Sequence, residues 1–251
     1  MAGPLTAGPP AALREAIILC GGLGTRLRAV VSDVPKPMAM VAGRPFLDYV
    51  LAYLAAEGVE RVILAAGYKA DVIQARYGAR WRGLEIACST EAQPLGTGGG
   101  LRLAMKRLHG EAAIVVNGDS LLLAPMAPLA GPLAAGADLV LTACRRADTA
   151  GGGVCAVAQG RLIGLRPGVA GEPGLVNAGV YAVRRSLFDQ LDLPAAFSFE
   201  GDVLETLARG LDARVVVSDA DFIDIGEPQT YVAAQALLGE GSGPNKGPTD
   251  G

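Results

Sequence analysis

The 251-residue sequence has little cysteine, a single histidine and no surplus of basic residues. Its four cysteines lack CxxC spacing, which argues against a zinc site and a disulfide framework and favours a reducing compartment such as the cytoplasm. A formal net charge of −3 provides no cationic excess to follow a polynucleotide, so nucleic acid is not an expected partner. The only histidine, His109, follows an amphipathic helical pattern, and no Ser-His or Cys-His nucleophilic site is expected.

The sequence also lacks an uninterrupted apolar segment of the kind that forms a membrane-spanning helix. The uncharged stretch at 121–137 contains Pro125, Pro128 and Pro132, each of which would break a membrane helix, so we expect a buried loop with a short helix and no membrane partner. The first residues contain proline and glycine where a signal peptide needs a continuous apolar segment, so we do not expect a secretion signal there. We expect flexible tails at 1–14, which is interrupted by prolines and glycines, and at 239–251, which holds too few apolar side chains to order itself.

The sequence does contain a regular alternation of strand-like and helical segments, and 51% of its residues are apolar, which is enough for a large core. This alternation predicts an α/β fold with a Rossmann-like, mostly parallel sheet and helices on both faces. The predicted strands span 16–19, 61–66, 84–88 and 112–116, and the predicted helices span 45–57, 69–77 and 101–108.

After Asp138 the pattern changes to shorter strands separated by glycine-rich turns, which predicts β-hairpins. These strands are expected at 139–144, 154–158, 161–165 and 175–183, followed by helices near 200–209 and 228–238 that flank a strand pair, RVVV and DFIDI. We predict one domain over 15–238. Its first half (15–137) would bind a nucleotide, and its smaller β-rich half (138–238) would bind a second substrate on the same sheet.

A glycine-rich loop, LCGGLGTRL at 19–27, directly follows the first predicted strand. Loops at the carboxyl edge of such a sheet bind ligands, and glycines let backbone N–H groups approach an anion, so phosphate is the expected guest. The dinucleotide fingerprint fails because leucine occupies the third glycine position, and the Walker A pattern lacks its GK[ST] ending. A simple tight turn is the alternative.

Ten residues after Arg26, Lys36 stands between Pro35 and Pro37. The two prolines restrict the backbone, which favours an ammonium group held near the glycine loop, although a solvated surface turn is the alternative.

Together these segments resemble the GGxGTRL and PKP signature of the nucleotidyltransferases that make nucleoside diphosphate sugars. The resemblance covers roughly residues 15 to 238 and continues, in order, through PFLDY at 45–49, GYK at 67–69, EAQPLGTGG at 91–99, NGD at 117–119, NAGVY at 177–181 and FIDIG at 222–226. It implies a glycosyltransferase-A-like fold. It also implies attack by a sugar 1-phosphate oxygen on the α-phosphorus of a nucleoside triphosphate, with release of pyrophosphate and assistance from Mg²⁺.

The family's catalytic and metal-binding roles fall on four residues. Arg26 and Lys36 would hold the triphosphate, and Asp119 and Asp224 would bind Mg²⁺ through hard carboxylate oxygens. Alternatively, Asp119 forms an N-cap or Asx turn and Asp224 is the partner of a basic residue.

The resemblance also implies substrate contacts. Backbone groups that would line the base and phosphates belong to Leu19, Gly21, Gly22, Gly24, Thr25, Gly96 and Thr97. Asn117 and Asn177 would offer donors and acceptors to sugar hydroxyls, as would Glu200, unless Ser198 instead caps the helix that follows.

One position departs from the family pattern. The lysine that grips the sugar phosphate corresponds to Gly168 in LRPGV at 165–169. We expect Arg166 to bind this phosphate in its place, with a solvated hairpin residue as the alternative.

Within the family, the runs FSFEGDVLE and FIDIG resemble guanylyltransferases that act on D-glycero-D-manno-heptose 1-phosphate, which makes GTP and this sugar phosphate the expected substrates. Mannose 1-phosphate guanylyltransferases and N-acetylmuramate 1-phosphate uridylyltransferases are alternatives. A non-catalytic regulator that binds a nucleotide sugar and, more weakly, a nicotinamide oxidoreductase also stay open. So does the oligomeric state, a homo-oligomer included.

Overall fold

The computed structural model describes residues 13–21, 34–67, 69–220 and 222–239, so the predicted site residues Gly22, Gly24, Thr25 and Arg26 lie outside the described residues. The two predicted tails also lie outside them, except at their inner ends. There Leu13 is fully buried in the apolar core beside the first strand, and the carbonyl oxygen of Arg14 accepts the N–H groups of Glu60 and Arg61, so the predicted N-terminal tail extends too far by these two residues. At the other end, Gly239 is the last residue of a helix.

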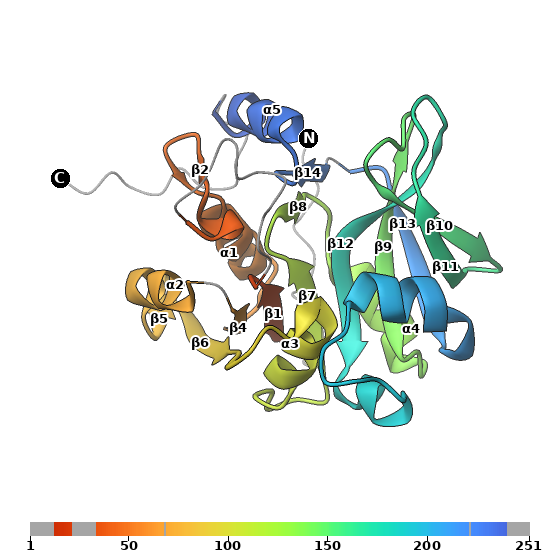
Figure 1. Ribbon diagram of the computed structural model, residues 1–251, viewed down its shortest axis with the longest axis horizontal. Helices are drawn as coiled ribbons and strands as arrows, with labels where there is room; N and C mark the ends of the chain where they lie inside the picture. The colour runs from red at the N-terminus through yellow and green to blue at the C-terminus, as the bar shows by residue number, and fades with distance from the viewer. Residues whose placement is uncertain (1–12, 22–33, 68, 221, 240–251) are drawn as a thin grey trace, which may run out of the picture.

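A mixed sheet of ten strands forms the centre of the molecule (Figure 1). Its first half is parallel, in the order β7-β1-β4-β6, as the sequence predicts. The strands of this half are β1 (Glu15–Leu19), β4 (Arg61–Ala66), β6 (Leu84–Thr90) and β7 (Ala112–Asn117), with β5 (Arg80–Trp81) antiparallel at the edge.

Helices cover both faces of this parallel half, because successive strand residues point to opposite sides. Ile18 packs in the core that includes α1 (Phe46–Ala56) and α2 (Ala70–Tyr77), whereas Ile17 packs in a second core that includes α3 (Gly96–Met105). The predicted helices at 45–57 and 69–77 are confirmed. The third begins at Gly96, five residues before its predicted start at 101, so most of the predicted loop is its first turn.

The β-rich half joins the sheet through β12, which runs antiparallel to both β7 and β9. Its strands are β9 (Leu139–Arg146), β10 (Gly153–Ala158), β11 (Arg161–Pro167), β12 (Gly174–Arg184) and β13 (Ala213–Ser218). The β10–β11 hairpin continues the sheet beyond β13, and β10 also touches β12 at one residue pair.

The predicted pairing of RVVV with DFIDI is wrong. Strand β13 instead pairs in parallel with β9, while β14 (Phe222–Asp224) pairs with β8 (Ser120–Leu122), a strand at the start of the stretch predicted to be a loop. The physical reason is burial: Ile223 and its neighbours on β8 lie in the core against the parallel half. This small antiparallel pair brings Asp119 and Asp224, the two predicted metal ligands, close together.

Short elements complete the chain. The remaining strands are β2 (Met40–Val41) and β3 (Arg44–Pro45). The remaining helices are the 3-10 helices at Lys36–Met38, Ala127–Leu129, Arg185–Gln190 and Ala208–Gly210, α4 (Ala130–Ala134), a π-helix at Phe199–Leu207 and α5 (Pro228–Gly239). Across the described part of the chain, none of these helices is long and apolar enough to cross a bilayer.

Candidate active site

Lys36 and Asp119 form an ion pair, with Nζ 2.5 Å from Oδ2. Lys36 is largely buried: it begins a 3-10 helix directly after Pro35, and 14% of its side chain is exposed. Asp119 lies in the turn between β7 and β8. Gly118 makes this turn possible, because a Cβ there would lie 2.6 Å from the carbonyl oxygen of Leu19. The lysine predicted to stand near the glycine loop therefore lies at the carboxyl ends of β1 and β7.

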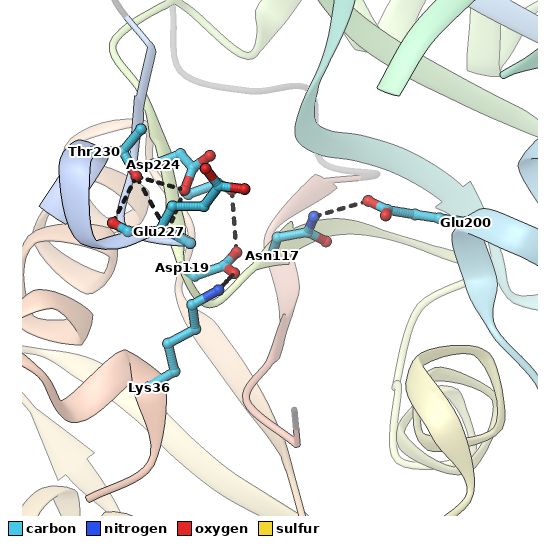
Figure 2. A network of polar contacts seen from close by, with 9 residues as sticks. Lys36, Asn117, Asp119, Glu200, Asp224, Glu227 and Thr230 are labelled. Carbon is cyan, nitrogen blue, oxygen red and sulfur yellow. Dashed lines mark hydrogen bonds and ion pairs between the residues drawn. The ribbon is translucent and has the colours of Figure 1, made fainter. Parts of the chain in front are cut away.

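Asp224 lies beside Asp119 because β14 pairs with β8. Asp224 is opposite Ser120 in the strand register, and the N–H of Ile225 donates to the carbonyl oxygen of Asp119 at 3.0 Å. The two aspartates are far apart in the sequence, and the structure brings them to one place, as the resemblance implies. Figure 2 shows Asp119 between Lys36, which lies below it, and Asp224 and Glu227, which lie above it.

The surroundings of Asp224 disfavour its negative charge. Burial is the largest cause that raises the pKa of this carboxyl group, and the charges of Asp119 and Glu227 act in the same direction. The N–H of Gly226 and the ammonium of Lys36 oppose the shift. No group of three or more histidine, cysteine or acidic side chains suited to a metal occurs among the described residues. The candidate ligands are thus two carboxylates in an environment that favours a cation.

A second polar cluster gathers the residues predicted to bind the sugar. The side-chain amides of Asn117 and Asn177 each donate to Oε1 of Glu200 at 3.2 Å. A register irregularity in β12 between Asn177 and Tyr181 lets both side chains reach the cluster, and Gly179 takes a positive φ of 70° there. Figure 2 shows the bond between Asn117 and Glu200 close to the charged group.

Tyr181 is a member of this cluster that sequence reasoning did not assign. Its ring is fully buried, yet its hydroxyl accepts from Asn177 Nδ2 at 2.7 Å and donates to Glu200 at 3.3 Å. A tyrosine inside an otherwise apolar strand is the signal that could have found it. The alternative considered for Glu200 is also observed, because Ser198 Oγ accepts the N–H of Gly201 and caps the helix.

One cavity of about 150 Å³ joins the two clusters. Its lining consists of Leu19, Cys20, Lys36, Pro37, Thr97, Asn117, Asp119, Phe199 and Glu200. Predicted phosphate-binding, metal-binding and sugar-binding side chains therefore face a common space at the carboxyl edge of the sheet.

The two described glycine segments lie at the same edge. Gly21 follows β1 and approaches Gly67, while the carboxylate of Glu91 lies against both of them and against Gly100. Glu91 Oε2 also accepts the N–H of Leu95 at 2.8 Å, which attaches the second loop to the end of β6. This anchoring role was not apparent in the sequence, where Glu91 was only part of a motif.

Arg166 is not among the described residues that line this cavity. It lies near the end of β11, half exposed, and forms an ion pair with Glu172 at 3.6 Å. Gly168 is excluded as a lysine position by this backbone, since a Cβ there would lie 1.7 Å from the carbonyl oxygen of Thr149. The missing lysine thus has a steric explanation, while phosphate binding by Arg166 stays a prediction.

Comparison with known proteins places this geometry in a family. The model of the nucleotidyl transferase family matches residues 15–241, so the chain belongs to that family. The sequence is 39% identical over 225 residues to D-glycero-alpha-D-manno-heptose 1-phosphate guanylyltransferase of Aneurinibacillus thermoaerophilus, covering 89% of this chain and 98% of the relative. It is 35% identical to mannose-1-phosphate guanylyltransferase of Mycobacterium tuberculosis, over 92% of this chain and 66% of that protein.

A solved structure agrees with these relatives. HddC from Yersinia pseudotuberculosis, complexed with GMP-PN, superposes with a TM-score of 0.79 at 31% identity, covering 89% of this chain and 99% of HddC. The predicted α/β nucleotidyltransferase fold is thereby confirmed, as is the resemblance to the heptose guanylyltransferases. The nicotinamide oxidoreductase considered as an alternative has no support in this family.

Proposed function

We propose that the protein transfers GMP from GTP to D-glycero-α-D-manno-heptose 1-phosphate and releases pyrophosphate. The observation that carries this proposal is the shared cavity, where the Lys36–Asp119 ion pair lies next to the hydrogen-bonded group of Asn117 and Glu200. The guanine base and the heptose are taken from what the relatives are named for. Mannose 1-phosphate is the second candidate acceptor, because a mannose-1-phosphate guanylyltransferase is also a relative.

The reaction brings two phosphorylated anions together, so most of the catalytic work is charge neutralisation and in-line positioning. Lys36 would supply a compact positive charge at the α-phosphate, with the N–H groups of the glycine segments at the other phosphate oxygens. Arg26 keeps the role that the resemblance implies for it, as a second cation on the triphosphate. No protein nucleophile is needed when the sugar phosphate oxygen attacks directly.

The residues present fit a magnesium ion. Mg²⁺ typically takes one or two carboxylates and completes its octahedron with phosphate oxygens and water, which matches the pair formed by Asp119 and Asp224. Burial raises the pKa of Asp224 more than the N–H of Gly226 and the ammonium of Lys36 lower it, so a bound cation would stabilise its ionised form. When bound, the ion would neutralise charge between the reacting phosphates. These two aspartates would hold it.

The second cluster would orient the acceptor. Glu200 can accept from sugar hydroxyls, while the amides of Asn117 and Asn177 offer both a donor and an acceptor. Both asparagines already donate to Glu200, so sugar hydroxyls would exchange with existing polar partners. We propose that Arg166 binds the sugar phosphate in place of the family's lysine. Because GTP is a cytosolic metabolite and all four thiols are free, we also propose a cytoplasmic location.

Pyrophosphate release tests this function. The full chain is incubated with Mg²⁺, each of GTP, UTP and ATP, and a panel of sugar 1-phosphates that includes the heptose, mannose and N-acetylmuramate compounds. We expect turnover with GTP and the heptose phosphate. The Asp119→Asn variant keeps the side-chain oxygen that bonds Ser120 but loses the charge, and we expect it to lose on the order of 100-fold or more in kcat.

Two results would contradict the proposal. Tight binding of a GDP-sugar without turnover of any sugar phosphate would identify a non-catalytic regulator. Preferred turnover of UTP with N-acetylmuramate 1-phosphate would identify the uridylyltransferase alternative.

A further inference from the structure

Residues 95–99, which end the loop after β6 and form the first turn of α3, are bonded directly to the segment that carries Glu200, although the two belong to opposite halves of the chain. Three of the bonds join main-chain atoms: Gly98 N and Gly99 N to the carbonyl oxygen of Phe197 at 2.9 and 3.3 Å, and Phe197 N to that of Leu95 at 2.9 Å. The fourth uses a side chain, since Thr97 Oγ1 accepts the N–H of Phe199 at 2.9 Å.

Three glycines in this first turn of α3 are required by the contact. A Cβ at Gly96 would lie 2.5 Å from the carbonyl oxygen of Phe197, and one at Gly98 would lie 2.2 Å from the ring of Phe197. A Cβ at Gly99 would lie 2.7 Å from the carbonyl oxygen of Ala195. The motif predicted to line the nucleotide is therefore also the surface on which the sugar-side segment 195–199 packs.

Thr97 accepts a hydrogen bond from the first residue of the helix that carries Glu200. The first N–H groups of a helix have no partner within the helix, and each needs another acceptor. The N–H of Gly201 uses Ser198 Oγ at 3.0 Å, as is usual for an N-cap, whereas the N–H of Phe199 uses Thr97, which precedes it by 102 residues. Glu200 is the next residue, and it lines the same cavity as Thr97. A shift of Thr97 would therefore shift Glu200.

We propose that Thr97 is a positioning residue that couples the two substrate sites, so that nucleotide bound at loop 94–97 raises the affinity for the sugar 1-phosphate. The proposal rests on the proposed guanylyltransferase function. Nucleotide contacts would hold the loop, and the loop holds Phe199 and Glu200 through the Thr97 hydroxyl. The substrate that binds first then bears the entropy cost of ordering Glu200, and the second substrate binds to a site that is already ordered. Linkage requires the sugar phosphate to raise nucleotide affinity by the same factor.

Calorimetry of the full-length protein tests the coupling. The heptose 1-phosphate, with mannose 1-phosphate in parallel, is titrated with and without α,β-methylene-GTP, which cannot release pyrophosphate. For the wild type we expect the analogue to tighten sugar phosphate binding by about tenfold, within the usual range of coupling energies. Thr97→Val keeps the side-chain shape but loses the acceptor, and its enhancement should fall towards one. The nucleotide contact expected of Thr97 uses its backbone, so analogue binding should stay within about twofold. Thr97→Ser should restore the enhancement.

Thr206→Val is the matched control, because Thr206 Oγ1 donates to Gly201 within the same helix and makes no bond to the nucleotide loop. It should keep the wild-type enhancement. An unchanged enhancement in Thr97→Val, or equal loss of binding for both ligands with a lowered unfolding midpoint, would overturn the coupling role. If the valine variant does not fold, Thr97→Ala replaces it, and the same loss of enhancement is expected. A wild type that turns over substrates without enhancement refutes only the coupling, whereas one that neither binds nor turns over sugar phosphates refutes the proposed function as well.

Discussion

The hydroxyl of Tyr181 meets the carboxylate of Glu200 at 3.3 Å, from a ring that is fully buried against Phe199. The edge of one ring faces the other, with 5.2 Å between the centroids. A buried tyrosine needs a partner for its hydroxyl, and here the partners are two side chains of the proposed sugar site. Core packing thus holds part of the site in place.

Replacing Tyr181 with phenylalanine should weaken sugar binding while sparing the nucleotide. The variant keeps the ring contacts but removes the hydroxyl that bonds Asn177 and Glu200. The loss of about 1 kcal/mol predicts a KM for the sugar 1-phosphate about fivefold higher, with an unchanged KM for GTP. Steady-state kinetics with each substrate varied in turn checks this. Equal increases in both KM values would mean that the hydroxyl acts on the whole fold.

Asp224→Asn should stabilise the metal-free protein and impair its use of Mg²⁺. Burial first, and then the negative charge of Asp119, raises the pKa of Asp224, so ionisation above that pKa costs folding stability. This cost is absent at low pH and fully present once the pH exceeds the folded-state pKa. At pH 7 the neutral amide should raise the unfolding midpoint by about 2–4 °C, the shift expected for roughly 1 kcal/mol in a domain of this size.

The same variant should need a higher Mg²⁺ concentration for half-maximal activity, because one hard oxygen ligand loses its charge. Thermal unfolding in EDTA and a magnesium titration of pyrophosphate release measure the two effects separately. A lowered midpoint, with unchanged magnesium dependence, would show that Asp224 serves the fold and not the ion.

Glu15, at the start of β1, is predicted to stabilise the fold at the edge of the sheet opposite the site. Its carboxylate pairs with Arg61 at 2.6 Å and accepts the N–H groups of His109 and Gly110 at 2.9 and 2.7 Å, with 11% of the side chain exposed. Glu15→Ala leaves the N–H groups of His109 and Gly110 without this acceptor and removes one partner of Arg61, which keeps Glu85 and the carbonyl oxygen of Arg107. It should cost about 3 kcal/mol of unfolding free energy in urea. The exposed pair of Arg14 and Glu60 is the control, and Glu60→Ala should cost less than about 1 kcal/mol. Similar losses for both variants would count against this prediction.

Arg166→Ala is expected to raise the KM for the sugar 1-phosphate and to leave GTP binding unchanged. The reason is its expected role as the cation that replaces the family's lysine, whose position is closed to any side chain by the contact between Gly168 and Thr149. Gly168→Lys should therefore destabilise the protein and not restore binding to Arg166→Ala. Kinetics that do not change in Arg166→Ala would leave this residue as the surface partner of Glu172.

The local patterns were enough for the parallel half of the sheet. Alternating apolar runs identified β1, β4, β6 and β7, because a strand buried on both faces must be continuously apolar. The resemblance to the nucleotidyltransferase family also predicted that Lys36, Asp119 and Asp224 form one group, and the structure brings them together. In contrast, the start of α3 was missed because three consecutive glycines are weak helix formers in isolation. Their contact with residues 195–199 stabilises that first turn.

The glycine loop by itself predicted a phosphate ligand, and the family that the motifs resemble supplied the predicted reaction, because carboxylates, a lysine and glycine segments suit phosphates. Only tertiary packing decided which of these groups contact one another. Strand β14 pairs with β8 and not with β13, and Thr97 accepts the N–H of Phe199, which lies 102 residues later in the sequence. Such long-range partners depend on which buried surfaces fit together, and no local pattern of residues encodes that fit.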